Sequence, residues 1–484
     1  MNESSVDKAK AGVVIKAGIW YTVSSFLTKG VAFITTPIFT RLLSSNEYGE
    51  YSNFVACASI LVVVATMEMH TTVNRARYDY DNLDGYLSSV AISGTLVTTL
   101  IWGIVQLFPT FFCQLFGMEM KYINVLFITT MVSPALQLLQ AKNRINYKYK
   151  TYVALSFGSV FLSTMISLGL VLLMKDKFAG RIIGHYGTVF VIDLCVYIYI
   201  ILKGRQFKWS ECKYALLICI PIVPHLLSKH VLSQSDRIMI KHFCGASDAA
   251  YYSLAYSCAM IPMMLATAMN IAWSPWSSEM IHEEKFSVVR KASYFYIILF
   301  YSVVLGIIVL GPEAVLILGG EKYAEAVHVM PPVVLGAVFQ FLYNLYVSLE
   351  QFAKKTVGMA FGSVAAALIN IVLNWLLIPR YGYTAAAYTT LVGYACLLII
   401  HYFLAKRTGY SQAYDEKFIF ASVAVMFCAM LCMLWLYTKP AIIRYCIAAV
   451  IIACIGWFAY KKKDFILSIL KKGSKKSKKD PSGE

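Results

Sequence analysis

The sequence predicts an all-α integral membrane protein with about fourteen transmembrane helices, on three observations. Hydrophobic residues make up 59% of the 484 residues and charged residues only 14%, whereas soluble domains hold about 25% charged residues. Apolar runs long enough to cross a hydrocarbon core of about 30 Å recur along nearly the whole chain. Basic residues gather in alternate connections between these runs. No stretch remains that could fold as a soluble domain.

Length and hydropathy place the individual helices. The expected spans are 14–40, 48–73, 86–112, 122–141, 151–174, 180–202, 214–241, 249–280, 290–311, 326–353, 357–378, 382–405, 416–438 and 440–460. Proline disturbs two of them, since it removes a backbone donor. The seventh span contains Pro221 and Pro224 and the eighth contains Pro262 and Pro275, so kinked or broken helices are expected there.

The basic residues predict the orientation. About 30 of the 43 Lys and Arg lie on the side that includes both termini, about 10 on the other side and about 3 within the spans. Both termini are therefore expected in the cytoplasm. A lysine cluster near the C-terminus is expected to lie against anionic lipids, and nucleic acid is not an expected partner. The 12 cysteines show no metal-ligand spacing, so neither a disulfide nor a metal site is predicted.

An internal repeat relates the two halves of the chain. Residues 45–52 resemble residues 246–253 in composition and in position, with an offset of 248 − 47 = 201. Six spans separate the copies, and an even number gives both copies the same orientation, as in parallel transporter repeats. Chance similarity of two tyrosine-rich interfacial turns is the alternative interpretation.

Two lysines predict a cationic cavity. Lys29 lies in the first span and Lys229 in the seventh, and a lysine inside a membrane faces a polar cavity or a partner because lipid cannot solvate it. Each lysine belongs to a polar stripe at helical spacing. The stripes are Thr22, Ser25, Lys29, Thr36 and Thr40, and His225, Lys229, Ser233 and Asp236. Interhelical hydrogen-bonding faces are the alternative. The 201-residue offset pairs Lys29 with His230 and not with Lys229. Whether the two lysines are related by the symmetry of the repeat is therefore left open.

Other charged residues have more than one interpretation. Asp193 interrupts the sixth span, where it is a candidate for protonation or cation binding, or for pairing with a buried lysine. Glu68 and Arg75 lie seven residues apart, so they are expected on one helical face that looks into the cavity from its cytoplasmic half. Arg75 also fits an ordinary interfacial charge, and Arg237 lies toward the outer end of the seventh span.

Three segments carry a resemblance to a known family. Residues 369–394, INIVLNWLLIPRYGYTAAAYTTLVGY, resemble the late-helix pattern of Wzx-type polysaccharide and O-antigen flippases. These belong to a superfamily that includes multidrug MATE exporters and the lipid II flippase. The matching residues are Asn370, Asn374, Pro379, Gly382, Ala386, Ala387 and Thr389. Residues 37–51 and 236–252 resemble two further segments of the family. Ala249, Ala250, Thr384 and Ala385 depart from its usual turns.

The resemblance implies two MATE-like six-helix lobes, at 1–212 and 213–410, an additional helix pair at 411–462 and a basic cytoplasmic tail at 463–484. It also implies a multi-pass flippase of the bacterial inner membrane. Such a protein moves an undecaprenyl-pyrophosphate-linked oligosaccharide by alternating access, and other polysaccharide-assembly proteins are candidate partners. The expected substrate contacts are Lys29, Lys229, Ser25, Thr36, His225, Arg75 and Arg237.

Coupling to a proton or sodium gradient is expected, with Asp193 and Glu68 as the first candidates. No cofactor is predicted. Because the chain has no GxxxxGK phosphate loop, a transporter is favoured over an ATP-hydrolysing enzyme. Two alternatives remain at this point. A multidrug cation antiporter would favour an acidic, aromatic cavity. A membrane glycan polymerase or ligase would favour a large outer loop.

Overall fold

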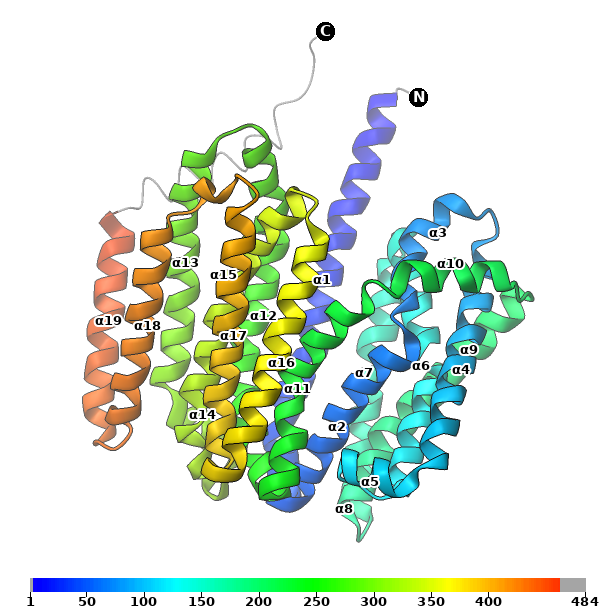
Figure 1. Ribbon diagram of the computed structural model, residues 1–484, viewed down its shortest axis with the longest axis horizontal. Helices are drawn as coiled ribbons and strands as arrows, with labels where there is room; N and C mark the ends of the chain where they lie inside the picture. The colour runs from blue at the N-terminus through cyan, green and yellow to red at the C-terminus, as the bar shows by residue number, and fades with distance from the viewer. Residues whose placement is uncertain (1–2, 462–484) are drawn as a thin grey trace.

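The computed structural model describes residues 3–461 as long helices that run roughly side by side (Figure 1), with no strand among these residues. The α-helices of the first half are α1 (Glu3–Leu42), α2 (Ser45–Thr66), α3 (Val73–Asp79), α4 (Leu83–Leu107), α5 (Pro109–Phe116), α6 (Met120–Ile145), α7 (Tyr149–Leu173), α8 (Lys177–Ile182) and α9 (Thr188–Gly204). The 3-10 helix η1 (Met69–Thr72) and the π-helix η2 (Ile183–Gly187) lie among them.

The second half begins with α10 (Trp209–Cys219), α11 (Val223–Cys244), α12 (Ala246–His282), α13 (Phe286–Val309) and α14 (Gly311–Gly319). It continues with η3 (Glu321–His328), α15 (Met330–Phe352), α16 (Thr356–Tyr381), α17 (Tyr383–Lys406), η4 (Ser411–Ala413), α18 (Glu416–Leu436) and α19 (Ala441–Lys461). The predicted basic tail at 463–484 lies outside the described residues.

Most of these helices can cross a membrane. Among the described residues, 11 helices are long and apolar enough, and the bent pair α10 and α11 raises the number to 12. The helices α1 and α19 occupy the first and last predicted spans but fall outside this count. The all-helical membrane architecture is therefore confirmed, while the number fourteen stays a prediction.

Proline acts differently in the two spans where we expected disturbance. The seventh span is broken: α10 and α11 meet at 58°, and Pro221 lies between them in residues 220–222, which no helix includes. The eighth span is continuous, since α12 passes through both Pro262 and Pro275. A proline removes one donor and crowds the preceding turn, and neighbouring helices can hold such a turn in place.

Reciprocal contacts support the internal repeat. Thr40 at the end of α1 donates to the carbonyl of Leu318 in α14, and Lys241 at the end of α11 donates to the carbonyl of Gly117 after α5. The donors are separated by 241 − 40 = 201 residues and the acceptors by 318 − 117 = 201. A two-fold relation requires this exchange, because residue i then contacts j wherever j contacts i. Helix starts agree, with 246 − 45 = 201 for α12 and α2.

The two halves meet most closely where α2 crosses α12. A Cβ atom on Gly49 would lie 1.7 Å from the carbonyl oxygen of Ala246, so only glycine allows this approach. Three residues further along α2, the hydroxyl of Ser52 is hydrogen-bonded to that of Ser253. These serines are equivalent at the 201-residue offset, as expected for residues at a two-fold axis.

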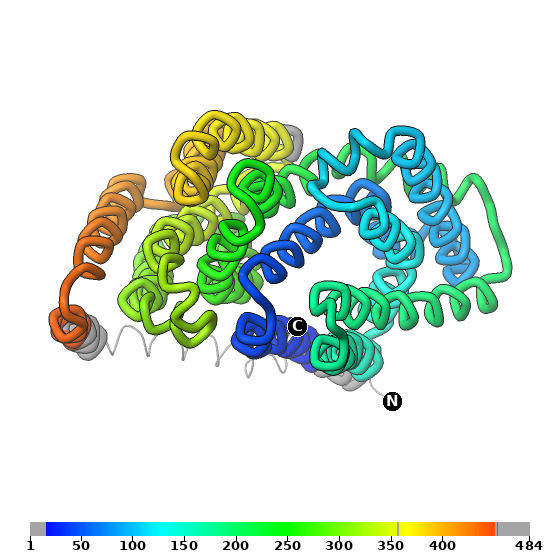
Figure 2. Tube along the Cα trace, turned by 90° about the horizontal axis from the view of Figure 1, so that it is seen from below, coloured from blue at the N-terminus to red at the C-terminus, as the bar shows by residue number. Residues whose placement is uncertain are grey.

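The last two helices attach to the outside of the second half. Figure 2 shows α18 and α19 at one edge of the bundle. Arg444 of α19 is only 4% exposed and pairs with Glu313 in the first turn of α14, and Tyr437 donates to the carbonyl of Ile308. The ion pair offsets the cost of an arginine within an apolar helix. The boundaries proposed at residues 212 and 410 stay predictions.

Candidate functional site: a cationic cavity

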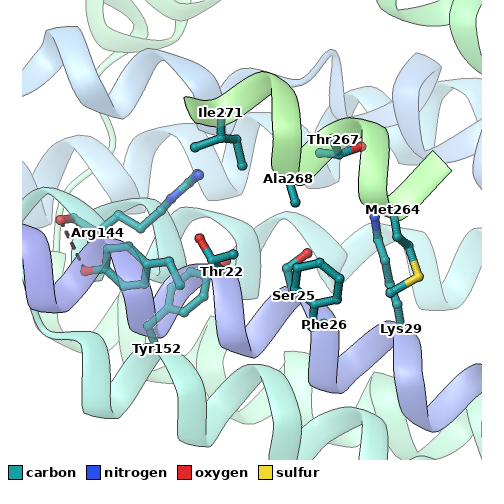
Figure 3. Close-up of a pocket in the computed structure, with 11 residues that line it drawn as sticks. Thr22, Ser25, Phe26, Lys29, Arg144, Tyr152, Met264, Thr267, Ala268 and Ile271 are labelled. Carbon is teal, nitrogen blue, oxygen red and sulfur yellow. Dashed lines mark hydrogen bonds between the residues drawn. The ribbon is translucent and has the colours of Figure 1, made fainter. Parts of the chain in front are cut away.

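A cavity of about 740 Å³ lies between the two halves of the bundle. Side chains of α1, α2 and α7 line it from the first half, and side chains of α11, α12, α15 and α17 from the second. A groove of about 190 Å³ continues from it between α1 and α12. Figure 3 shows this groove, with Thr22, Ser25 and Lys29 along α1 and Arg144 toward one end.

The walls of the cavity carry positive charge. Lys29 and Arg181 contribute from the first half, and Lys229 and Arg237 from the second. Among the described residues that line the cavity and the groove, none is an aspartate or a glutamate. Neither Lys29 nor Lys229 has a hydrogen-bonding or ion-pair partner within the described part of the chain. Uncompensated cations at a membrane-embedded cavity attract an anion.

The two arginines are held in fixed orientations. The Arg237 guanidinium donates to the carbonyl of Ser233 at 2.8 Å and to Oε1 of Gln234 at 2.6 Å, and it lies 4.4 Å from the ring centroid of Tyr256. The Arg181 guanidinium lies 3.5 Å from the centroid of Phe39, and it donates to the Ser167 hydroxyl at 2.8 Å.

Stacking of this kind leaves guanidinium N–H groups free for a ligand, in a planar arrangement that suits phosphate or carboxylate oxygens. The lysines supply mobile point charges instead. The cavity therefore combines two oriented donors with two adaptable cations.

The offset of 201 residues relates positions on opposite walls. Lys29 and His230 both line the cavity, as do Thr36 and Arg237, with 230 − 29 = 201 and 237 − 36 = 201. The symmetry partner of Lys29 is therefore His230, and Lys229 lies one residue before it. Equivalence between the two lysines, left open by the sequence, does not hold at this offset.

The structure brings most of the predicted substrate residues together. Lys29, Lys229, Thr36 and Arg237 line the cavity, and Ser25 lines the groove beside Lys29. His225 lies outside the cavity lining, and its Nδ1 atom is buried without a hydrogen-bonding partner in the described residues. Their roles in substrate binding stay predictions.

Glu68 and Arg75 lie elsewhere, and the expectation of one shared helical face is wrong. The helix α2 ends at Thr66. Met67 and Glu68 then adopt left-handed conformations with φ of 50° and 53°, so the helix is interrupted before α3 begins. Arg75 is exposed and pairs with Asp79 at 3.3 Å. A seven-residue spacing places two side chains on one face only within a continuous helix.

Glu68 has its own neighbour, His70, with Oε2 and Nδ1 separated by 3.6 Å. Burial raises the pKa of the Glu68 carboxyl and lowers the pKa of His70 to about 4, because both charged forms lose solvation. The imidazole of His70 is therefore neutral near neutral pH, so this contact is not an ion pair there.

Asp193 lies on α9, 3% exposed, and its Oδ1 atom has no hydrogen-bonding partner among the described residues. It does not line the cavity, and no pairing with a lysine is seen within the described part of the chain. Its assignment to ion coupling stays a prediction.

Arg181, His185 and Arg144 line the cavity or the groove but were not predicted from the sequence. Arg181 and His185 lie at the junction of α8 and η2, where a π-helix turn faces α7. A Cβ atom on Gly184 would lie 2.3 Å from the Cα atom of Ser167, so glycine lets this turn come close to α7. The signal that could have found them is two basic residues four positions apart, which lie about one helical turn from each other at the start of an apolar run.

Asp236 belongs to a buried polar cluster behind the cavity wall. Its carboxylate accepts hydrogen bonds from Tyr252 at 2.5 Å, Asn374 at 2.6 Å and Thr390 at 2.6 Å. These contacts join α11 to α12, α16 and α17, and Asn374 is also bonded to Asn370 and Thr389. Three of the residues that carry the family resemblance therefore lie in this cluster.

Comparisons with known proteins agree with the fold. Residues 14–281 match the family described as polysaccharide biosynthesis protein, and residues 221–376 match the MatE family. A relative in Haemophilus influenzae, "Lsg locus putative protein 1", is 23% identical over 57% of this chain and 68% of its own length. The "probable low-salt glycan biosynthesis flippase Agl15" of Haloferax volcanii is 22% identical over 82% of this chain and 85% of its own length.

A solved structure has the same arrangement of helices. The lipid II flippase MurJ, in an inward closed conformation, superimposes with a TM-score of 0.73 at 16% identity, over 93% of this chain and 100% of that chain. The polysaccharide biosynthesis match covers 281 − 14 + 1 = 268 of the 484 residues, more than half. The chain shares its fold with the lipid II flippase MurJ and belongs to the family described as polysaccharide biosynthesis protein.

Proposed function

We propose that this protein is a flippase that moves a lipid-linked oligosaccharide, carried on undecaprenyl pyrophosphate, across the bacterial inner membrane. The observation that carries the proposal is the cavity between the halves, with four cations and no carboxylate among its described lining residues. A pyrophosphate linkage bears two negative charges, one on each phosphate. Lysine ammonium groups and stacked guanidinium groups bind such oxygens strongly once water is excluded.

The rest of the cargo fits the other parts of the site. The hydroxyl and amide groups of the walls, among them Thr36, Asn270 and Gln340, offer hydrogen bonds to sugars. The groove between α1 and α12 adds Thr22, Ser25 and Thr267 as further hydroxyl groups for the glycan. The transport step would be a rocking of the two halves that opens and closes their contact at α2 and α12, as in other repeat-built transporters.

A multidrug cation antiporter is the second candidate, favoured by the MatE match over residues 221–376. The charge of the cavity opposes it. An organic cation would meet Lys29, Arg181, Lys229 and Arg237 with no neutralising carboxylate among the described lining residues, and like charges in a low-dielectric site repel strongly.

Leaflet-resolved transport in liposomes tests the proposal. Purified protein is reconstituted with a fluorescent undecaprenyl-pyrophosphate-linked saccharide, and a membrane-impermeant quencher reports the leaflet. We expect the double variant Lys29→Ala, Lys229→Ala to lose transport by about tenfold or more, because a hydrogen bond to a charged group contributes about 1.5–3 kcal/mol.

Two controls isolate the effect. The double variant Lys29→Arg, Lys229→Arg keeps both charges and should retain most transport, and Lys439→Ala removes a lysine that lies outside the cavity. Wild-type transport by the double alanine variant would overturn the assignment of the cavity. Efflux of organic cations without lipid movement would favour the antiporter.

A further inference from the structure

A buried acid–base pair lies close behind the cavity. Glu350 on α15 and His401 on α17 are 1% and 0% exposed, and Oε1 of the carboxyl lies 2.7 Å from Nδ1 of the imidazole. The other polar atom of each group, Oε2 of Glu350 and Nε2 of His401, is buried without a hydrogen-bonding partner in the described residues. Purely structural buried pairs are normally satisfied on all their polar atoms.

Because these atoms are unpaired, the net charge of the pair depends on how many protons it holds. A neutral imidazole that donates Nδ1–H to a carboxylate leaves the pair with a net charge of −1. One added proton, on either group, brings the net charge to zero. Because an uncompensated charge within a membrane protein is costly, the gain or loss of this proton changes the local electrostatic free energy substantially. The pair is thus a suitable place to hold one exchangeable proton.

Two contacts connect the pair to the cavity. The ring of His401 lies 5.1 Å from the ring of Tyr343, and Tyr343 lines the cavity. On α11, His225 is within electrostatic range of both His401 and Lys229. His225 and Lys229 are four residues apart, which is about one helical turn. Tyr343 thus joins the pair to the cavity wall, and His225 lies between the pair and a lysine that lines the cavity.

Charged groups on the helices next to the pair include some with partners of their own. Lys355 at the start of α16 donates to the carbonyl of Arg407 at 2.9 Å. Glu416 on α18 accepts a hydrogen bond from Tyr402 at 2.7 Å and pairs with Lys406 at 3.5 Å. Lys354, four residues after Glu350, is exposed. His225 on α11 interacts electrostatically with both His401 and Lys229.

We propose that Glu350 and His401 form a proton-binding site whose occupancy is linked to the binding of an anion in the cavity, through His225 and Lys229. This inference rests on the proposed function. When the pair is deprotonated, its negative charge attracts the Lys229 ammonium group and so competes with the anion for it. With the pair protonated, Lys229 is free to bind the anion. Linkage is reciprocal, so anion binding draws a proton onto the pair.

Proton uptake on anion binding tests the linkage. Inorganic pyrophosphate is added to purified full-length protein in weakly buffered medium, and a pH dye and equilibrium dialysis report protons and bound pyrophosphate. Glu350→Gln keeps the size of the side chain and an acceptor for His401 but cannot hold the charge. We expect the wild-type protein to take up about one more proton per bound pyrophosphate than this variant, since one site is removed.

The controls separate the possible causes. Protons that pyrophosphate itself gains or loses contribute equally in both proteins, because the cavity cations are unchanged. Glu416→Gln, one helix away, should behave like the wild-type protein.

Equal proton uptake by the wild-type protein and Glu350→Gln, with pyrophosphate bound by both, would overturn the linkage and leave the flippase standing. An absence of pyrophosphate binding by the wild-type protein would overturn the anion site, and the linkage with it.

Discussion

At the scale of single residues, the decisive property of the cavity is which cations lie free and which are already neutralised. Arg444 and Lys241 sit in the same bundle, yet each has a carboxylate partner, Glu313 and Glu50. Lys29 and Lys229 have none among the described residues. An unpaired charge in a membrane protein is costly. Lys29 and Lys229 therefore indicate a site for an anionic ligand, whereas Arg444 and Lys241 indicate structural roles.

Arg181 provides a residue-scale prediction, with Arg75 as its control. Each substitution to alanine removes one guanidinium group, but only Arg181 lines the cavity. We expect Arg181→Ala to weaken pyrophosphate binding by about tenfold or more, because it removes a charged hydrogen-bond donor. Arg75→Ala should change it by less than about twofold, since an exposed ion pair contributes about 0–1 kcal/mol. Equal losses from both variants would mean that the cavity is not the binding site.

At the scale of elements, close approach of helices depends on glycine at a few positions. Gly49 on α2 and Gly184 on η2 lie against the backbone of another helix, whereas Gly103 on α4 has nothing within 4 Å of its Cβ position. All three look alike in the sequence. Their different roles follow from which neighbouring helix lies against them.

The contrast gives a stability prediction. Gly49→Ala should destabilise the fold by about 1–3 kcal/mol, the usual cost of overpacking, because its Cβ would overlap the carbonyl oxygen of Ala246. Gly103→Ala should be neutral or stabilise by up to about 1 kcal/mol, the difference in helix propensity. Thermal unfolding in detergent measures both. A melting temperature that falls equally for both variants would contradict the close crossing of α2 and α12.

At the scale of the whole molecule, the cavity and its closure are properties of the two halves together. The contacts of α1 with α14 and of α11 with α5 are exchanged between the halves, and the serine pair lies where α2 meets α12. Relative movement of the halves must change these contacts. The same symmetry places Lys29 opposite His230 across the cavity.

Cross-linking at the serine pair tests this movement. The variant Ser52→Cys, Ser253→Cys places two thiols where two hydroxyls are in contact, close enough for a disulfide after small adjustment. We expect oxidation to abolish transport and a reducing agent to restore it, because the halves can no longer rock. Each single variant treated with the same oxidant is the control. Full transport by the cross-linked protein would mean that the α2 and α12 contact does not open.

Local properties of the sequence were enough to predict the membrane helices, one polar stripe and the internal repeat. The length of the apolar runs predicted the helices, and helical spacing predicted the stripe that contains Lys29. The tyrosine-rich turns predicted the 201-residue offset, which the contacts of Thr40 and Lys241 match. Each of these features depends on neighbours in the chain, which is why composition and periodicity reveal them.

Tertiary structure alone decided which polar groups meet. The break at Met67 and Glu68 removed Arg75 from the cavity, and the π-turn before α9 brought Arg181 into it. The pairing of Glu350 with His401 joins residues 51 positions apart on different helices. The sequence by itself determined that this is a helical membrane protein with lysines inside its spans. Where those cations gather was decided by packing, because burial and partnership depend on helices that are distant in the chain.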